Sequence, residues 1–173
     1  MPDLRLPFYQ AAAMESILQA GLATKMAAID TEVTADTMVL RAPAAANYYR
    51  GATSQDVALT DTLPAIVIIY LGTAQDDELR SEDLATHSWE LQYIETAVGV
   101  AEFATPQGEL EERVSRAGVA IWQTLEDNKT LTVSTVEYSA SWLLDRMVPA
   151  EIELNGDVWV QGISLWFRCD FGW

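Results

Sequence analysis

The stretch EIELNGDVWVQGISLWFRCDF, residues 151–171, is the most informative part of the sequence, because it predicts a β-hairpin that leads into a long strand. Two strand-like runs flank Asn155-Gly156, and this dipeptide suits the two central positions of a type I′ turn, which require positive φ. Apolar residues alternate along the return strand, but their parity reverses between Val160 and Ile163, which predicts a β-bulge at Gly162. The large apolar side chains at this end therefore predict a sheet and no reaction centre.

The length of 173 residues fits a single domain, residues 1–173, large enough to bury a hydrophobic core. No apolar run approaches the roughly 20 residues of a membrane-spanning helix. The opening MPDLRLPFYQ lacks the basic region and apolar core of a signal peptide, so we expect a chain that folds in a cytoplasm and binds no membrane. The single cysteine, Cys169, cannot form an internal disulfide, and its place on an alternating strand predicts a buried hydrophobic role.

The charge is strongly negative, with 26 acidic residues against 10 basic ones and a formal net charge of −16. Such a chain repels nucleic-acid phosphates, and its Lys and Arg residues are scattered along the sequence, so we expect no specific nucleic-acid binding. An acidic surface can line a passage through which DNA slides without sticking, or it can simply keep a protein soluble. Composition leaves both readings open.

Two helices are predicted by apolar stripes at helical spacing. Residues 7–30 form the first, with Pro7 in its first turn, and its stripe consists of Met14, Ile17, Leu18, Leu22, Met26 and Ile29. The second begins at the cap Thr105, continues through Pro106 and ends near Asn128, and its stripe consists of Leu110, Val114, Ala117, Ile121 and Leu125. Its favourable charge pairs four residues apart are Glu109–Arg113 and Glu112–Arg116.

Strands are predicted where apolar residues alternate or run together. The run IVIIY within residues 62–71 predicts a central strand covered on both faces, and the alternation in residues 86–100 predicts a half-buried strand. The remaining segments are predicted as strands at 37–40 and 130–138, an acidic loop at 76–83 and an irregular stretch at 139–150. This order predicts an α+β fold with a mixed, mainly antiparallel sheet, two main helices packed on one side and a C-terminal β-hairpin.

A long loop is expected at about residues 41–61, where periodicity is mixed and turn-forming residues are frequent. It carries Tyr48, Tyr49 and Arg50, which are residue types enriched where proteins contact one another. We therefore take these three as candidates for subunit or partner contact. The alternative is that the tyrosines lie back on the body of the domain.

The sequence contains no recognisable motif of a catalytic or cofactor-binding site. His87 is the single histidine and no nucleophile-elbow motif accompanies it, so we expect it to be structural. One His and one Cys do not make a zinc site, and no glycine-rich phosphate loop is present. We expect no catalytic, cofactor-binding or metal-binding residues and no enzyme. Two alternatives stay open: a hydrolase that uses paired carboxylates, and a ligand-binding pocket lined by some of the six tryptophans.

The order of elements resembles that of the tail terminator proteins of long-tailed bacteriophages. The similar elements are the N-terminal helix, PAIVIIYLG at 64–72, THSWELQYIETAVGV at 86–100, ELEERVSRAGVAIWQTLED at 109–127 and DVWVQGISLWFRCDFG at 157–172. The resemblance covers most of the chain as a layout without an invariant motif. Related head-to-tail joining proteins share much of this layout.

This resemblance implies an α+β domain that assembles into a hexameric ring on the last ring of tail-tube subunits. Such a ring stops tube polymerisation, offers a surface to the head connector or an adaptor protein, and lets DNA pass through its lumen without specific binding. The implied location is the virion neck, after assembly in the host cytoplasm, and no cofactor is implied. The chain departs from the family by its longer loop at 41–61 and the irregular stretch at 139–150. Another neck or head-tail adaptor protein is the closest alternative.

Overall fold

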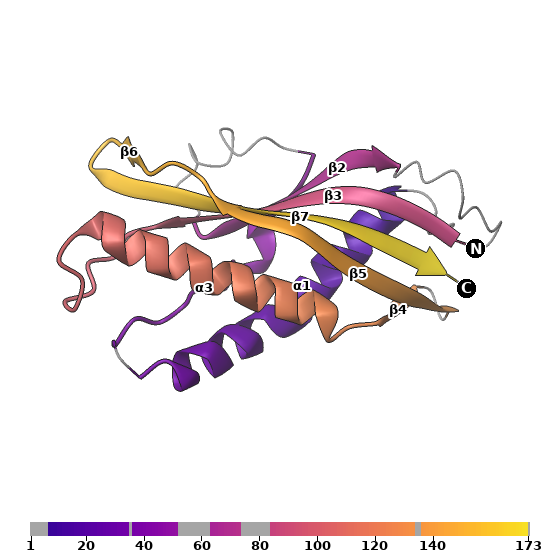
Figure 1. Cartoon of the computed structure of the whole chain (residues 1–173), viewed down its shortest axis with the longest axis horizontal. Helices are drawn as coiled ribbons and strands as arrows, with labels where there is room; N and C mark the ends of the chain where they lie inside the picture. The colour runs from indigo at the N-terminus through magenta and orange to yellow at the C-terminus, as the bar shows by residue number, and fades with distance from the viewer. Residues whose placement is uncertain (1–6, 35, 52–62, 74–83, 134–135, 173) are drawn as a thin grey trace.

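The computed structural model describes residues 7–34, 36–51, 63–73, 84–133 and 136–172, and the statements below concern these ranges (Figure 1). The elements are α1 (Pro7–Glu32), a short 3₁₀ turn (Ala45–Asn47), β1 (Tyr48–Arg50), β2 (Ala65–Thr73), β3 (Leu84–Thr96), α3 (Pro106–Glu126), β4 (Thr130–Val133), β5 (Val136–Pro149), β6 (Glu153–Asn155) and β7 (Val158–Gly172).

The strands of the described residues form one seven-stranded sheet in the order β1-β2-β3-β7-β5-β4, with β6 paired to β7 beside β5. All pairs are antiparallel except β1 with β2. Both helices lie on the same side of the sheet (Figure 1). This arrangement confirms the predicted α+β class, the mixed and mainly antiparallel sheet and the C-terminal hairpin.

The main core lies between the two helices and one face of the sheet. Both predicted helical stripes are buried there, with Leu18, Leu22, Val114 and Ile121 at 0% exposure. Thr105 caps α3 as predicted, because its side chain accepts a hydrogen bond from the backbone N–H of Gly108. From the sheet, β7 contributes the alternating residues Ile163, Leu165, Phe167 and Cys169.

The β-bulge predicted at Gly162 is wrong, because the β3–β7 ladder continues through this residue with Ile94 opposite it. The parity of apolar residues reverses for another reason. Val160 points to the opposite face of the sheet, where it belongs to a second small cluster with Ala65, Val67 and Ile94. Both faces of the sheet are buried at this position, so apolar residues occur at even and at odd positions of the strand.

The predicted hairpin exists, but its turn lies one residue later than expected. Asn155 pairs with Val158, so the two turn residues are Gly156 and Asp157. Gly156 has a φ of 62°, which a glycine adopts without steric cost at the first central position. Asn155 thereby stays in the ladder of β6.

The irregular stretch predicted at 139–150 is also wrong, because these residues belong mostly to the long strand β5. Ala140, Trp142 and Leu144 alternate onto the core side, and a register shift at Asp145 then moves Met147 onto it. A bulge of this kind inserts one residue and reverses the parity of the pattern. Because of this shift, the apolar residues of β5 do not follow one continuous two-residue alternation, which is the pattern by which a strand is recognised in a sequence.

Three further segments differ from, or fall outside, the sequence-based expectations. Residues 37–40 lie outside the strands of the described chain, although Met38 and Leu40 are buried. The expected loop at 41–61 contains the edge strand β1, and its residues 52–61, like the acidic segment 76–83, lie outside the described residues. Strands β2 and β3 confirm the predicted strands at 62–71 and 86–100, with somewhat different bounds.

Gly118 of α3 packs tightly against side chains of the sheet. A Cβ there would lie 2.7 Å from Met147 Sδ and 2.9 Å from Ile163 Cδ1. We expect Gly118→Leu to lower the free energy of unfolding by about 2 kcal/mol through overpacking, measured by urea denaturation. Val119→Leu, at an exposed position one residue on, is the control and should change stability by less than about 0.5 kcal/mol. Equal stability of both variants would contradict this packing.

Candidate interaction surfaces

The predicted contact residues Tyr48, Tyr49 and Arg50 form the edge strand β1 and pair in parallel with residues 66–68. Tyr48 packs against the main core and Tyr49 against the second cluster, so both rings rest on the body of the domain. Burial, with a smaller effect of the Glu15 carboxylate, raises the pKa of Tyr48 to about 12.

Arg50 is the most exposed of the three residues of β1. Its Nε lies 3.1 Å from a carboxylate oxygen of Glu15, and its guanidinium carbon lies 5.2 Å from the ring centroid of Phe8. Phe8 is itself 66% exposed. Phe8 and Arg50 therefore present an apolar and cationic surface at the β1 edge, and a partner contact there stays a prediction.

A buried ion pair, Glu109–Arg113, holds the segment that follows β3. The Glu109 carboxylate accepts hydrogen bonds from the backbone N–H groups of Val98, Gly99 and Val100 and from Arg113, at 2.8–2.9 Å. Both side chains are 1% exposed. Burial acts to raise the pKa of Glu109, but these hydrogen bonds outweigh it and lower the pKa below its usual value.

A second buried carboxylate, Glu95, is held by Arg41 and Tyr93. The Arg41 guanidinium donates to both carboxylate oxygens, and the Tyr93 hydroxyl lies 2.8 Å from one of them. Burial, and then the Glu95 charge, raises the pKa of Tyr93 well above its usual value. Glu95 and Glu109 are thus fully used in structural contacts, which leaves the hydrolase alternative without support from either.

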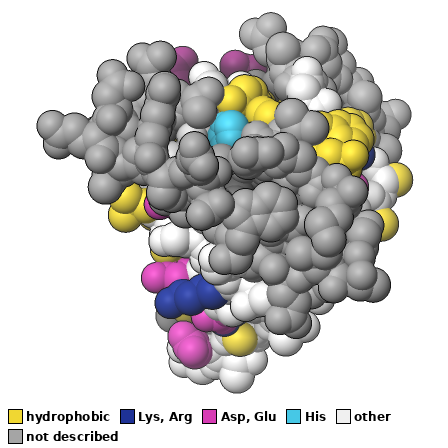
Figure 2. Space-filling view, turned by 90° about the vertical axis from the view of Figure 1, so that its right-hand side faces the viewer, with side chains coloured by type: hydrophobic (Ala, Val, Ile, Leu, Met, Phe, Trp, Pro, Cys, Tyr) yellow, Lys and Arg dark blue, Asp and Glu magenta, His cyan; other side chains and the backbone are white. Residues whose placement is uncertain are grey.

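His87 and Cys169 face each other across the β3–β7 ladder and are both buried. The Tyr70 hydroxyl lies 2.9 Å from Nδ1 of His87, and burial raises the pKa of the Cys169 thiol. The buried role predicted for Cys169 is confirmed. Figure 2 shows the histidine, in cyan, beside hydrophobic side chains. Among the described residues, no group of three or more His, Cys, Asp or Glu side chains could hold a metal ion.

The sheet face away from the helices, here called the open face, is only partly covered. At its centre the guanidinium of Arg146 lies 4.1 Å from the ring centroid of Trp166. Leu143 and Val148 on the same face are 53% and 43% exposed. Scattered exposed apolar residues are ordinary, but a group around a cation–π pair is typical of a contact surface.

The β6–β7 hairpin, here called the hairpin end, lies at the end of the sheet away from the described chain termini (Figure 1). All three residues of β6 are exposed. Leu154 and Val158 are 55% and 44% exposed, and the adjacent Val98 is 52% exposed. The hairpin end therefore offers apolar side chains to solvent, and a hollow of about 180 Å³ lies at its base.

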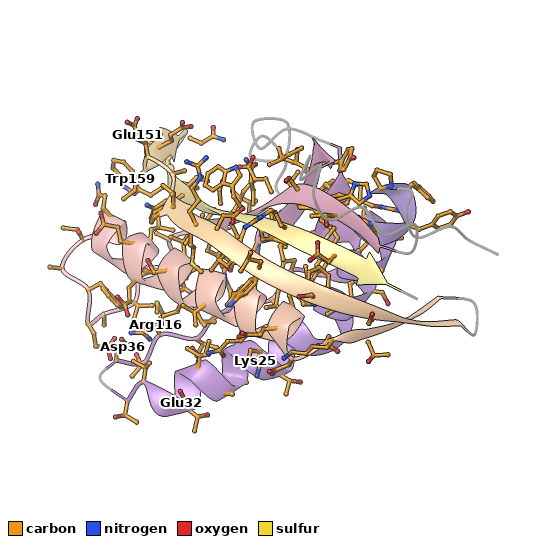
Figure 3. All side chains as sticks on the ribbon, turned by 45° about the vertical axis from the view of Figure 1, so that its right-hand side comes forward. Lys25, Glu32, Asp36, Arg116, Glu151 and Trp159 are labelled. Atoms are coloured by element: carbon orange, nitrogen blue, oxygen red, sulfur yellow. The ribbon has the colours of Figure 1, made fainter. Side chains whose placement is uncertain are left out.

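Most of the described Lys and Arg side chains are bound to carboxylates of the same chain. Figure 3 shows Arg116 beside Asp36, and the Arg116 hydrogen bond lowers the pKa of Asp36 below its usual value. The other such pairs are Lys25–Asp127, Arg41–Glu95, Arg50–Glu15, Arg113–Glu109, Arg116–Glu112 and Arg168–Asp145. Few cations are left to attract an external polyanion.

No protein-family model matches this chain, and no curated protein is significantly similar to it. The helices of the described residues are too short or too polar to cross a membrane.

Glu109 gives a test of the buried ion pair. Because its pKa is lowered on folding, its contribution to stability is complete above the unfolded value of roughly 4.3 and is lost as the pH falls through the folded value. We expect Glu109→Gln to lower the free energy of unfolding by about 3 kcal/mol at pH 7, since Arg113 stays buried without its partner.

The same variant should lose less stability than the wild type when the pH falls below roughly 4.3. Urea denaturation at several pH values measures both effects. Glu111→Gln, at an exposed position of the same helix, is the control and should behave like the wild type. Wild-type stability of Glu109→Gln at pH 7 would show that the pair is not a structural anchor.

Proposed function

We propose that this chain is a structural protein of a long-tailed bacteriophage virion, whose copies form a ring that ends the tail tube and joins it to the head connector. The proposed ring contains six copies. Its partners are the tail-tube protein and a connector or adaptor protein of the neck. An adaptor ring elsewhere in the neck is the alternative.

The observation that best supports a ring is the presence of two different exposed surfaces on opposite edges of one sheet. The β1 edge exposes Phe8 and Arg50, whereas the hairpin end exposes Leu154 and Val158. Each copy in a cyclic ring must present two different patches, one to each neighbour. Opposite edges of a rigid sheet are suited to this head-to-tail arrangement.

The observed order of elements supports the resemblance from which the function is inferred. An N-terminal helix precedes two antiparallel strands, a long capped helix and a closing strand at the centre of the sheet. The resemblance carries the assignment to a phage neck, and the fold agrees with it. A shared fold alone does not fix a function, so assembly must be tested directly.

The distribution of charge supports passage of DNA through the ring. The chain has a net charge of −16, and its described cations mostly lie in ion pairs with its own carboxylates. A free Lys or Arg in a lumen would bind DNA phosphates and release counterions, which favours binding over passage. Paired cations avoid this attraction.

The ring is tested by the mass of the purified chain in solution. We expect light scattering and native mass spectrometry to give about six times the 19.1 kDa of one chain, and negative-stain images to show closed rings. Addition of tail-tube protein from the same phage genome should increase the ring fraction, because the tube end orders the subunits. A chain that stays monomeric both alone and with tube protein would contradict the proposal.

The hairpin end is tested by Leu154→Asp, which places a charge on its exposed apolar surface. We expect this variant to fold and to run as a monomer, since a buried unpaired charge disfavours association. Val119→Asp is the matched control on α3, where the replaced side chain is also exposed, at 42%. Dissociation by Val119→Asp but not by Leu154→Asp would place the contact on the helical side.

A further inference from the structure

The open face carries a row of three side chains that runs across its central strands. Trp166 of β7 pairs with Glu90 of β3 on one side and with Arg146 of β5 on the other. Paired residues of neighbouring strands share a face, and Leu165 and Phe167, which flank Trp166 in the sequence, face the core. The three side chains therefore point away from the helices. An anion, an indole ring and a cation lie side by side on the open face.

Both charges of this row lack a partner of opposite sign among the described residues. Every other described arginine has a carboxylate partner, whereas Arg146 is exposed and contacts the Trp166 ring. Glu90 accepts a hydrogen bond at 2.8 Å from the neutral amide of Gln92. Two strand spacings of roughly 4.8 Å separate Arg146 from Glu90, so they do not pair within one chain. Each charge is available to a group from outside the chain.

Exposed apolar side chains flank the row on β5. Leu143 and Val148 are 53% and 43% exposed, and they pair with Arg168 and Ser164 on the open face of β7. Trp and Arg are the residue types that most often dominate the binding energy at the centre of a protein interface, where surrounding contacts exclude water. The row has this composition, so its natural occupant is another protein surface.

We infer that the open face binds the open face of a second copy of this chain, related by a two-fold axis parallel to β7. Such an axis places β5 of one copy over β3 of the other and the two β7 strands over each other. The Trp166 rings then meet, and each Arg146 lies opposite the other copy's Glu90. Both unpaired charges gain a partner, and the exposed apolar side chains of β5 are covered. Arg168, which comes near its counterpart, is held by Asp145 at 3.4 Å.

A second copy fits this face better than a partner that carries one sign of charge. An acidic surface would pair with Arg146 but would meet Glu90, and a basic surface would do the reverse. The open face of the same chain offers both signs in the required order. The contact goes beyond the proposed ring, whose neighbouring copies meet at the sheet edges and leave the open face free.

The test measures self-association of the Leu154→Asp chain, which lacks the proposed ring contact, by sedimentation equilibrium. We expect dimers with a dissociation constant on the order of 0.1 mM, because the contact surface is small. Arg146→Glu or Glu90→Arg, added to this chain, places like charges opposite each other and should weaken dimerisation about tenfold. A parent chain that stays monomeric at about 1 mM would overturn the inference.

Mixing the two reversal variants gives the decisive result. A dimer with one copy of each contains both ion pairs with their signs exchanged, so the mixture should associate about as tightly as the parent chain. Glu126→Arg, at an exposed position at the end of α3, makes the same charge change as Glu90→Arg and should leave dimerisation unchanged. ¹H–¹⁵N NMR spectra check that each variant is folded, and Arg146→Gln or Glu90→Gln replaces a variant that is not.

Three outcomes besides a monomeric parent would overturn the inference: full dimerisation of either reversal variant, no association in their mixture, or equal weakening by Glu126→Arg. The ring and the open-face contact fail separately. Arg146→Glu in the otherwise wild-type chain should leave the proposed ring intact, whereas Leu154→Asp should lose the ring and keep the open-face dimer.

Discussion

The constraint on which the structure depends is the pairing of β7 with β3 on one edge and with β5 and β6 on the other. One strand thereby fixes the register of most of the sheet. Its residues at odd positions, such as Leu165 and Phe167, must face the helices, and this leaves Trp166 and Arg168 on the open face. The helices cover one side only, so the exposed surfaces follow from the same register that builds the core.

The parts of the fold that could be predicted are those specified by local pattern. Both helices carry an apolar stripe at a period that no strand shares, and α3 also carries its own cap, Thr105. The parts that were missed depend on distant neighbours. Val160 was misread because a second cluster covers the other face, and β5 was missed because the shift at Asp145 breaks its alternation. Neither feature can be recognised from a short stretch of sequence.

The candidate surfaces were predicted less completely than the fold. Tyr48, Tyr49 and Arg50 were selected by residue type, and the structure shows two of them resting on the body while Arg50 contacts Glu15 and Phe8. The hollow at the hairpin end gave no sequence signal, because its walls come from β3, β7 and the residues 150–153, which strand pairing brings together. Sites of this kind arise from strand pairing, which sequence spacing does not reveal.

The proposed role as a scaffold in a phage neck requires the chain to be located there in the virion. A cryo-electron microscopy reconstruction of the neck, from the phage whose genome encodes the chain, makes the measurement. We expect a closed ring of this fold between the tail tube and the head connector, with DNA in its lumen and the sheet edges of neighbouring copies in contact. Virions whose neck contains no copy of this chain would contradict it.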